Sequence, residues 1–70
     1  MSDREIETFL MINEPTFEIN GKCYSVCVVD GVYGTWDSDG LTFDFPDVSA
    51  LLDNWMIDGK PFRNVVKNIM

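Results

Sequence analysis

Apolar residues near the N-terminus recur at the spacing of an α-helix. Three of them stand at i, i+3 and i+4 and share one helical face: Ile6, Phe9 and Leu10. Ser2 precedes this stripe and Glu5 follows three residues later, a pairing typical of a capping box. Asn13 and Pro15 then favour the end of a helix. The pattern therefore predicts a short helix between Ser2 and Asn13.

The middle of the chain alternates between apolar runs and turn signals. Asn20-Gly21 and Asp30-Gly31 suit two-residue type I′ hairpin turns. Asp37-Ser38-Asp39-Gly40 suits a type I turn that becomes a three-residue loop with a bulge when Gly40 is left-handed. Pro46 ends the last run because it cannot donate to a strand ladder. The pattern predicts an antiparallel meander with strands at residues 16–19, 22–29, 32–37 and 41–45.

The lengths of the three turns decide which side chains share a face of this sheet. Directly opposed residues lie on the same side. With the loop lengths above, one face carries nine apolar or aromatic side chains: Phe17, Ile19, Tyr24, Val26, Val28, Tyr33, Leu41, Phe43 and Phe45. A two-residue third loop would divide this set between both faces, because a slip of one residue inverts every side chain. The three-residue loop is therefore preferred.

The opposite face of the predicted sheet is mixed in character. Its members are Cys23, Ser25, Cys27, Val29, Val32, Gly34, Trp36, Thr42 and Asp44. Two arrangements are open. The N-terminal helix covers this face, since its apolar stripe must be buried somewhere, or the face stays open as an apolar patch anchored by Trp36 and marks an interface.

The last third of the chain predicts two further helices. Asp47 is a good N-cap, and Gly59 is placed to end the first of them. Its apolar stripe is Val48, Leu51, Leu52, Trp55 and Met56. Pro61 suits the first position of the last helix. The stripe of that helix is Phe62, Val65, Val66 and Ile69.

These elements predict an α+β fold of order αββββαα. It is a four-stranded antiparallel meander sheet with a short N-terminal helix and two C-terminal helices, in a single small domain over residues 1–70. Cys23 and Cys27 would lie on one strand about 13 Å apart, too far for a disulfide. We expect them to be small buried hydrophobic residues. No apolar run reaches the ~18 residues of a membrane span, and the polar N-terminus lacks a signal-peptide pattern, so we expect a cytoplasmic protein.

The residue types exclude most enzyme chemistry. The chain has no histidine, which removes the usual general base near neutral pH and the commonest metal ligand. Asp37-Ser38-Asp39-Gly40 differs from a calcium loop, because Gly comes at the fourth position and Val48 stands where the twelfth position requires Glu. Asp37 and Asp39 are expected on an exposed turn, where water screens their charges. We therefore expect a protein that is not an enzyme and that uses no cofactor or metal.

Charge is unevenly distributed along the chain. The net charge is −7, which disfavours direct binding to nucleic acid and to anionic membranes. No Lys or Arg occurs between Cys23 and Gly59, whereas seven acids do: Asp30, Asp37, Asp39, Asp44, Asp47, Asp53 and Asp58. Most of these acids are expected to form hydrogen bonds in turns and helix caps, which requires no partner. The functional interpretation is an acidic surface that docks on a basic one.

Two hypotheses of function follow. In the first, a non-enzymatic acidic binding protein inhibits or regulates a nucleic-acid-handling protein by occupying its basic groove. In size and charge, though in no motif, the chain is similar to phage-encoded inhibitors of bacterial defence enzymes, which mimic nucleic acid. The residues predicted for that surface are Asp30, Asp37, Asp39, Asp44 and Trp36. In the second, the protein is a structural or homo-oligomeric module, for example a homodimer. It interacts through Val29, Val32 and Trp36 and needs no charged partner.

Overall fold

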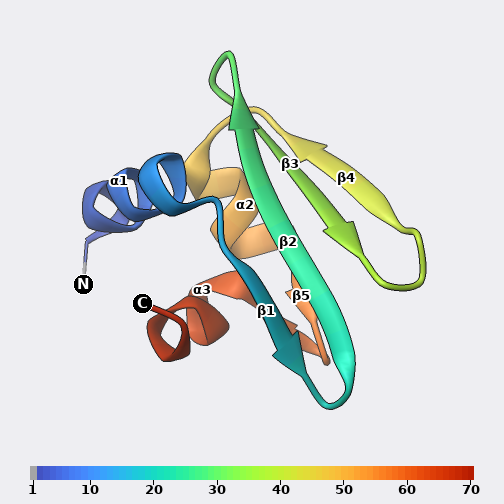
Figure 1. The fold of residues 1–70 in the computed structure, drawn as a ribbon. Helices are drawn as coiled ribbons and strands as arrows, with labels where there is room; N and C mark the ends of the chain where they lie inside the picture. The colour runs from blue at the N-terminus through green and yellow to red at the C-terminus, as the bar shows by residue number, and fades with distance from the viewer. Residues whose placement is uncertain (1) are drawn as a thin grey trace.

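The computed structural model of the protein describes residues 2–70. It consists of one helix, a sheet of four strands in the order β1-β2-β3-β4, and a C-terminal part that holds a strand pair and further helices (Figure 1). The elements are α1 Asp3–Asn13, β1 Thr16–Ile19, β2 Lys22–Val29, β3 Val32–Asp37, β4 Thr42–Phe45, α2 Val48–Asn54, β5 Met56–Ile57, β6 Lys60–Pro61, α3 Phe62–Val65 and the 3₁₀ helix η1 Val66–Asn68. The predicted α+β class and the antiparallel meander are confirmed.

Helix α1 begins and ends as its sequence predicts. The backbone N–H of Glu5 donates to the Ser2 hydroxyl at 3.2 Å, and that hydroxyl in turn contacts the Glu5 carboxylate. Glu14, in the left-handed region at φ 41°, follows the last helical residue and donates its N–H to the Leu10 carbonyl. Both ends of the helix are thus capped by local hydrogen bonds, and its orientation depends on what its apolar stripe contacts.

The strand register agrees with the turn chemistry. Phe17 faces Tyr24 across β1 and β2, and Val26 faces Thr35 across β2 and β3. The two-residue turns at 20–21 and 30–31 have both central residues at positive φ, as type I′ turns require.

The third turn is the predicted three-residue loop. Thr35 faces Phe43 across β3 and β4, which places Ser38, Asp39 and Gly40 in the loop. Gly40 has φ 86° and donates its N–H to the Asp37 carbonyl at 2.9 Å. The nine predicted side chains therefore do share one face of the sheet.

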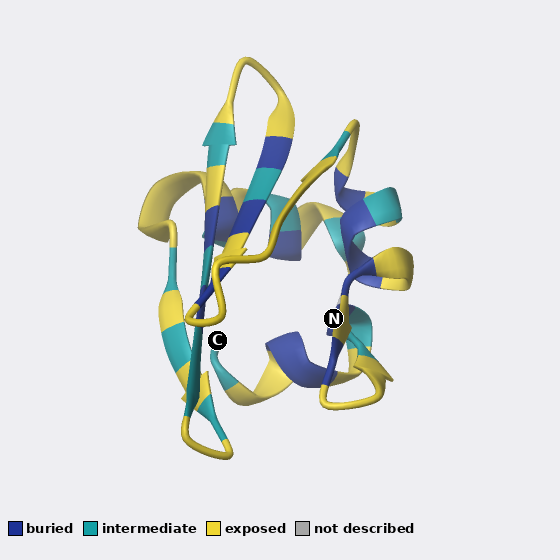
Figure 2. Cartoon of the chain, turned by 90° about the vertical axis from the view of Figure 1, so that its right-hand side faces the viewer, coloured by how far each residue is buried: buried dark blue, intermediate teal, exposed yellow. Residues whose placement is uncertain are grey.

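All helices pack on that one face. The buried cluster joins Ile6 and Leu10 of α1 to Tyr24 and Val26 of β2, so α1 lies on the same side as α2 and α3. Figure 2 shows the buried segments of sheet and helices facing one another, with the turns at the strand ends exposed. The structure therefore decides between the two arrangements of the opposite face, because α1 does not cover it.

The C-terminal part differs from the sequence prediction. Helix α2 ends at Asn54, short of the predicted end at Gly59. Met56–Ile57 and Lys60–Pro61 instead pair as a small hairpin. Its turn is Asp58-Gly59, with both residues at positive φ, the same type I′ signal that marks the first two turns of the meander. Met56 leaves the apolar stripe as a result and is 55% exposed.

The last helical stripe is confirmed, with a shift at its start. Pro61 ends β6 and is the N-cap of α3, so the helix begins at Phe62. Phe62, Val65 and Val66 are buried and Ile69 packs against them. The Phe62 ring lies 4.8 Å from Trp55, centroid to centroid, and 5.8 Å from Phe17. This aromatic cluster joins the C-terminal part to β1.

Candidate functional site

The strands present an uncovered face on the side opposite the helices, here called the outer face. The register places eleven residues on it: Thr16, Glu18, Cys23, Ser25, Cys27, Val29, Val32, Gly34, Trp36, Thr42 and Asp44. Their side chains are short except for Glu18 and Trp36, and the set contains two acids but no Lys or Arg. It is therefore a weakly acidic surface with a single large aromatic ring, that of Trp36.

Its apolar side chains lie at two places. Val29 and Val32 are direct cross-strand partners beside the Asp30-Gly31 turn, and they are 63% and 41% exposed. Trp36 lies nearer the other end of β3, opposite Ser25 on one side and Thr42 on the other, and is 45% exposed. The three residues of the predicted apolar patch thus share the open face, separated by Gly34.

Three of the four predicted acidic residues are exposed, and each has a different place. Asp30 lies in the β2–β3 turn, at the same end as the valine pair. Asp44 lies on the outer face opposite Gly34. A Cβ added at Gly34 would lie 3.4 Å from the Asp44 Oδ1, so the two residues are in close contact. Asp39 is at the tip of the β3–β4 loop.

Asp37 does not lie on an exposed turn, and that expectation was wrong. It faces the helices opposite Tyr24 and is only 5% exposed. Its Oδ1 accepts the backbone N–H groups of Asp39 at 2.9 Å and Leu41 at 3.1 Å. The buried carboxylate accepts the backbone N–H groups of the turn that follows it. Its Oδ1 is therefore already occupied.

Lys22 neutralises part of the negative charge of Asp37 and Asp39, at the β3–β4 loop. Its Nζ lies 2.7 Å from the Asp39 carboxylate and 3.6 Å from that of Asp37. The hydrogen bond with Asp39 raises the pKa of Lys22, although partial burial opposes the shift. Within residues 2–70, no ion pair involves Asp30, Asp44 or Glu18. These three carboxylates carry the uncompensated charge of the outer face and its rim.

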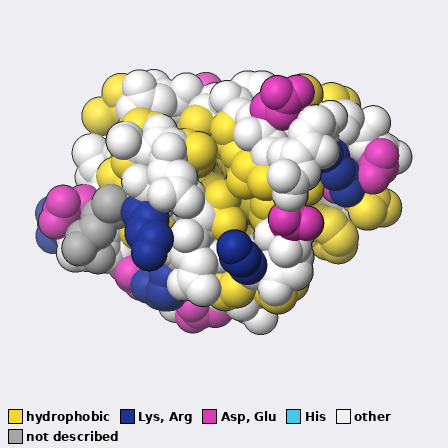
Figure 3. All heavy atoms as spheres, turned by 90° about the horizontal axis from the view of Figure 1, so that it is seen from below, with side chains coloured by type: hydrophobic (Ala, Val, Ile, Leu, Met, Phe, Trp, Pro, Cys, Tyr) yellow, Lys and Arg dark blue, Asp and Glu magenta, His cyan; other side chains and the backbone are white. Residues whose placement is uncertain are grey.

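Basic side chains are found mainly on the helical side. Arg63 of α3 donates to Asp3 of α1 at 2.6 Å and to Asp53 of α2 at 2.8 Å. The hydrogen bond from Arg63 holds the pKa of Asp3 below its usual value. Seen from below, the molecule shows Lys and Arg side chains together with Asp and Glu side chains around exposed hydrophobic surface (Figure 3). The helical side therefore carries both acidic and basic side chains, whereas the outer face carries acids without Lys or Arg.

Both cysteines are free thiols on the outer face, and Cys27, opposite Gly34, is exposed. The expectation that both are buried was wrong, because it assumed a covered face. Sequence reasoning also missed Thr16 and Glu18. The pairing of Phe17 with Tyr24 could have placed them here, since neighbours in a strand alternate between faces.

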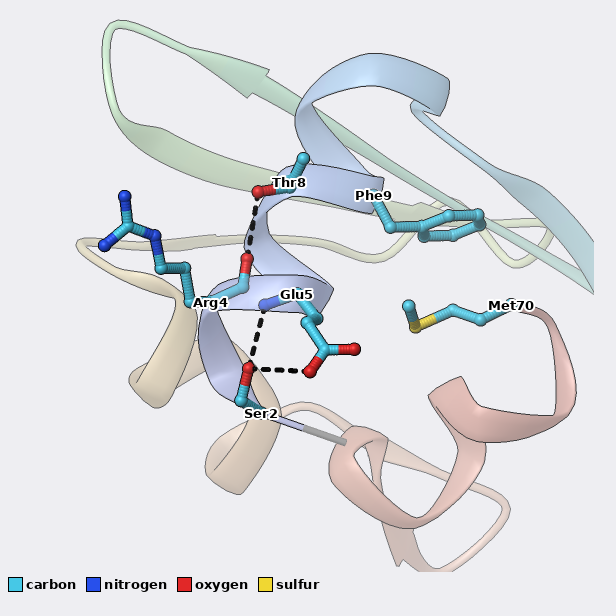
Figure 4. A pocket seen from close by; sticks show the side chains of 6 residues that line it. All are labelled: Ser2, Arg4, Glu5, Thr8, Phe9 and Met70. Atoms are coloured by element: carbon cyan, nitrogen blue, oxygen red, sulfur yellow. Dashed lines mark hydrogen bonds between the residues drawn. The ribbon is translucent and has the colours of Figure 1, made fainter.

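The groove between α1 and the C-terminus has no converging reactive groups. It has a volume of about 510 Å³ and is lined by Ser2, Arg4, Glu5, Thr8, Phe9 and Met70. Figure 4 shows the Phe9 ring and the Met70 side chain on facing sides of it. The hydroxyls of Ser2 and Thr8 are engaged within α1, with Glu5 and with the Arg4 carbonyl. The two hydroxyls of the groove are therefore occupied within the helix.

Comparisons with protein-family models, with curated proteins and with solved structures found no match to this chain. Among residues 2–70, no helix has the length and apolar character needed to cross a membrane. Over the same residues, no three side chains of His, Cys, Asp or Glu are grouped so that they could hold a metal ion. The outer face, with its uncovered Trp36, is the candidate functional site.

Proposed function

We propose that the protein is a non-enzymatic binding module whose outer face docks on a basic surface of a partner protein. One observation carries the proposal. A whole face of the sheet is left uncovered around a half-exposed Trp36, without Lys or Arg, and with Glu18, Asp30 and Asp44 as its charges. Uncovered aromatic and aliphatic side chains with uniform charge around them are typical of an interface.

The roles of the residues follow from their chemistry. A Trp ring supplies a large contact area at low conformational cost, and such rings often provide most of the binding energy. The short side chains of Ser25, Cys27 and Gly34 let a partner approach the sheet closely. Asp30 and Asp44 attract basic groups at long range and select among partners.

The partner that fits best is a nucleic-acid-handling protein. Its binding groove is basic because it must neutralise phosphates. A small acidic module placed in that groove would exclude the nucleic acid and so inhibit or regulate the partner. The cytoplasm is the compartment we propose for this activity.

The test is affinity capture of partner proteins by the immobilised protein, at about 50 mM and at about 500 mM salt. We expect the partner to be retained at low salt and lost at high salt, since the Debye length falls from over 10 Å to a few Å over that range. The double variant Asp30→Asn/Asp44→Asn removes both charges, keeps a residue suited to the type I′ turn at position 30, and should lose the partner. Glu14→Lys, at the exposed C-cap of α1, is the matched control and should retain it.

Trp36→Ala separates the aromatic contribution from the charges. Because the ring is exposed, the variant should keep its fold by circular dichroism and lose the partner. Capture that is insensitive to salt and to both acidic substitutions would contradict acidic docking.

The exposure of Val29, Val32 and Trp36 supports a second candidate, a homo-oligomeric module that pairs through this patch. Sedimentation of the isolated protein distinguishes the two. A monomer at high concentration contradicts self-association through the patch, and a dimer abolished by Trp36→Ala supports it.

A further inference from the structure

Strand β4 forms one edge of the sheet, and its outward backbone groups have no strand partner in the structure described for residues 2–70. The Asp37 N–H donates to the Leu41 carbonyl at 3.1 Å, so Leu41 directs its backbone groups toward β3. Backbone direction alternates along an antiparallel strand. Phe43 and Phe45 therefore also pair with β3, while the N–H and C=O groups of Thr42 and Asp44 point away from the sheet.

The helix-facing side of this edge is apolar and uncovered. Leu41 is 54% exposed, Phe43 47% and Met56 of the small hairpin 55%. In Figure 1, β4 and its preceding turn project to the right of the helices, beyond the layer that covers the rest of the sheet. A groove of about 220 Å³ lies under the strand, lined by Phe43, Phe45, Asn54, Trp55 and Met56. Apolar residues that the pattern assigns to the core are thus left without a covering element.

We propose that the β4 edge binds an extended segment of a partner protein as a fifth strand, one in which apolar residues alternate with basic ones. The backbone of the segment would pair with Thr42 and Asp44. Its apolar side chains would lie beside Phe43 and over Met56, on the helix-facing side. Its basic side chains would fall on the opposite side, next to Asp44. Strand addition with side-chain pockets at every second position is a recurrent mode of peptide recognition.

Charge decides in favour of a basic segment over a second copy of this chain. Asp44 of β4 has no ion-pair partner among residues 2–70, whereas Asp39 in the preceding loop is paired with Lys22. No base occurs between Cys23 and Gly59. A second copy would bring its own β4, with its own Asp44, and a net charge of −7 against the same charge. Opposite charges across neighbouring strands attract and like charges repel.

The other edge of the sheet is a poorer site. On β1 the side chains that face the helices, Phe17 and Ile19, are partly buried against the core. The side chain of Asn20, in the turn after β1, donates to Asp58 of the small hairpin at 2.6 Å and ties that end down. The β4 edge combines free backbone groups with uncovered apolar side chains. The β1 edge has free backbone groups but no uncovered apolar side chains beside them.

Two synthetic peptides test the proposal by titration, observed in the backbone amide NMR spectrum. In the first, Lys alternates with Phe and Val over about seven residues, long enough to span a four-residue strand. The second has Glu in place of Lys. We expect the Lys peptide to shift the amides of β4 and the Met56 hairpin, and to bind at least tenfold more tightly than the Glu peptide. A third peptide of the Lys composition, with its apolar residues clustered, controls for non-specific attraction and should leave these amides unshifted.

Edge pairing is tested by Thr42→Pro. The Thr42 N–H points away from β3, so the substitution removes a free donor without breaking the existing ladder. We expect it to abolish binding of the Lys peptide. Glu18→Pro, at the equivalent outward position on β1, is the matched control and should leave binding unchanged. Phe43→Thr keeps a strand-forming residue and should weaken binding at least fivefold.

Some results would overturn the proposal. Equal affinity for the Lys and Glu peptides would remove the basic character of the segment. Full binding by both folded Thr42→Pro and folded Phe43→Thr would place the peptide elsewhere. A dimer in sedimentation that Thr42→Pro converts to monomer would assign the edge to a second copy. These outcomes are distinct from failure of outer-face docking, which is tested through Trp36 and Asp30.

Discussion

The Asp37 carboxylate lies where strand β3 passes into the loop that leads to β4. One oxygen accepts two backbone N–H groups, and the other lies 3.6 Å from Lys22. The side chain of Asp37 is 7% exposed, whereas that of Asp39, two residues on, is 66% exposed. The same residue type thus has a structural role at one position and a surface position at the next.

We predict that Asp37→Ala destabilises the protein by about 1–3 kcal/mol, because two N–H groups at the edge of the core lose their acceptor. Asp37→Asn keeps an acceptor oxygen and should cost less. Asp39→Ala removes only a surface ion pair and should change stability by no more than about 1 kcal/mol. Urea unfolding followed by tryptophan fluorescence measures all three. Equal losses for Asp37→Ala and Asp39→Ala would contradict this role.

At the scale of elements, local turn chemistry determined most of what the sequence could predict. The Asn20-Gly21 and Asp30-Gly31 dipeptides set loop length, loop length set register, and register set the face of every strand residue. The prediction was wrong at Asp58-Gly59, where the apolar stripe through Trp55 and Met56 favoured a longer helix over the turn signal. Which face α1 covers could not be predicted, because an apolar stripe specifies that it is buried but not against what.

We predict that Gly59→Ala destabilises the β5–β6 hairpin by about 1–2 kcal/mol. Gly59 has φ 78°, a conformation that costs a residue with a Cβ about this amount. Gly34→Ala is the comparison, since Gly34 has ordinary strand geometry and a new Cβ there would meet its nearest neighbour at 3.4 Å. Gly34→Ala should leave the free energy of unfolding nearly unchanged. Thermal unfolding of the two variants measures the difference, and an equal loss in both would contradict the argument.

The three helices are joined at their surface by one side chain. Arg63 of α3 contacts Asp3 of α1 and Asp53 of α2, and neither carboxylate is deeply buried. Arg63 lowers the pKa of Asp3 in the folded state. A lowered folded pKa means that the stabilisation is present above the unfolded pKa, about 3.9, and is lost as pH falls through the folded value.

We predict that Asp3→Asn is less stable than the parent protein at about pH 7 and that the difference narrows as pH falls below about 4. Added salt should also narrow it, since the pair is exposed to solvent. Urea unfolding at a series of pH values measures the difference. A gap that stays constant down to about pH 3 would show that Asp3 acts through something other than its charge.

For the whole molecule, excess negative charge opposes compactness. Twelve acids and five bases give −7 within a radius of gyration of 10.9 Å, close to the Debye length of about 8 Å at physiological salt. The ion pairs of the described residues involve only Lys22 and Arg63 as bases. Most acidic side chains therefore contribute repulsion that acts across the molecule at low salt.

We predict that the melting temperature rises when sodium chloride is added from about 10 mM to about 200 mM, because the Debye length shortens from about 30 Å to less than 10 Å. Screening of the repulsion should exceed the weakening of the few ion pairs. Calorimetry at both salt levels measures the shift. The variant Glu14→Lys, with a smaller net charge, should show a smaller rise, and a fall in melting temperature with salt would contradict the prediction.

The meander order has a consequence for how quickly the chain reaches this structure. Every strand of the main sheet pairs with the next along the sequence, through loops of two or three residues. Little chain entropy is lost in closing such short loops, and proteins dominated by contacts close in sequence fold faster than those that join distant segments. A hairpin forms within about 1–10 μs. We therefore expect the β2–β3 hairpin to form early in refolding, before α3 packs on the sheet and completes the core.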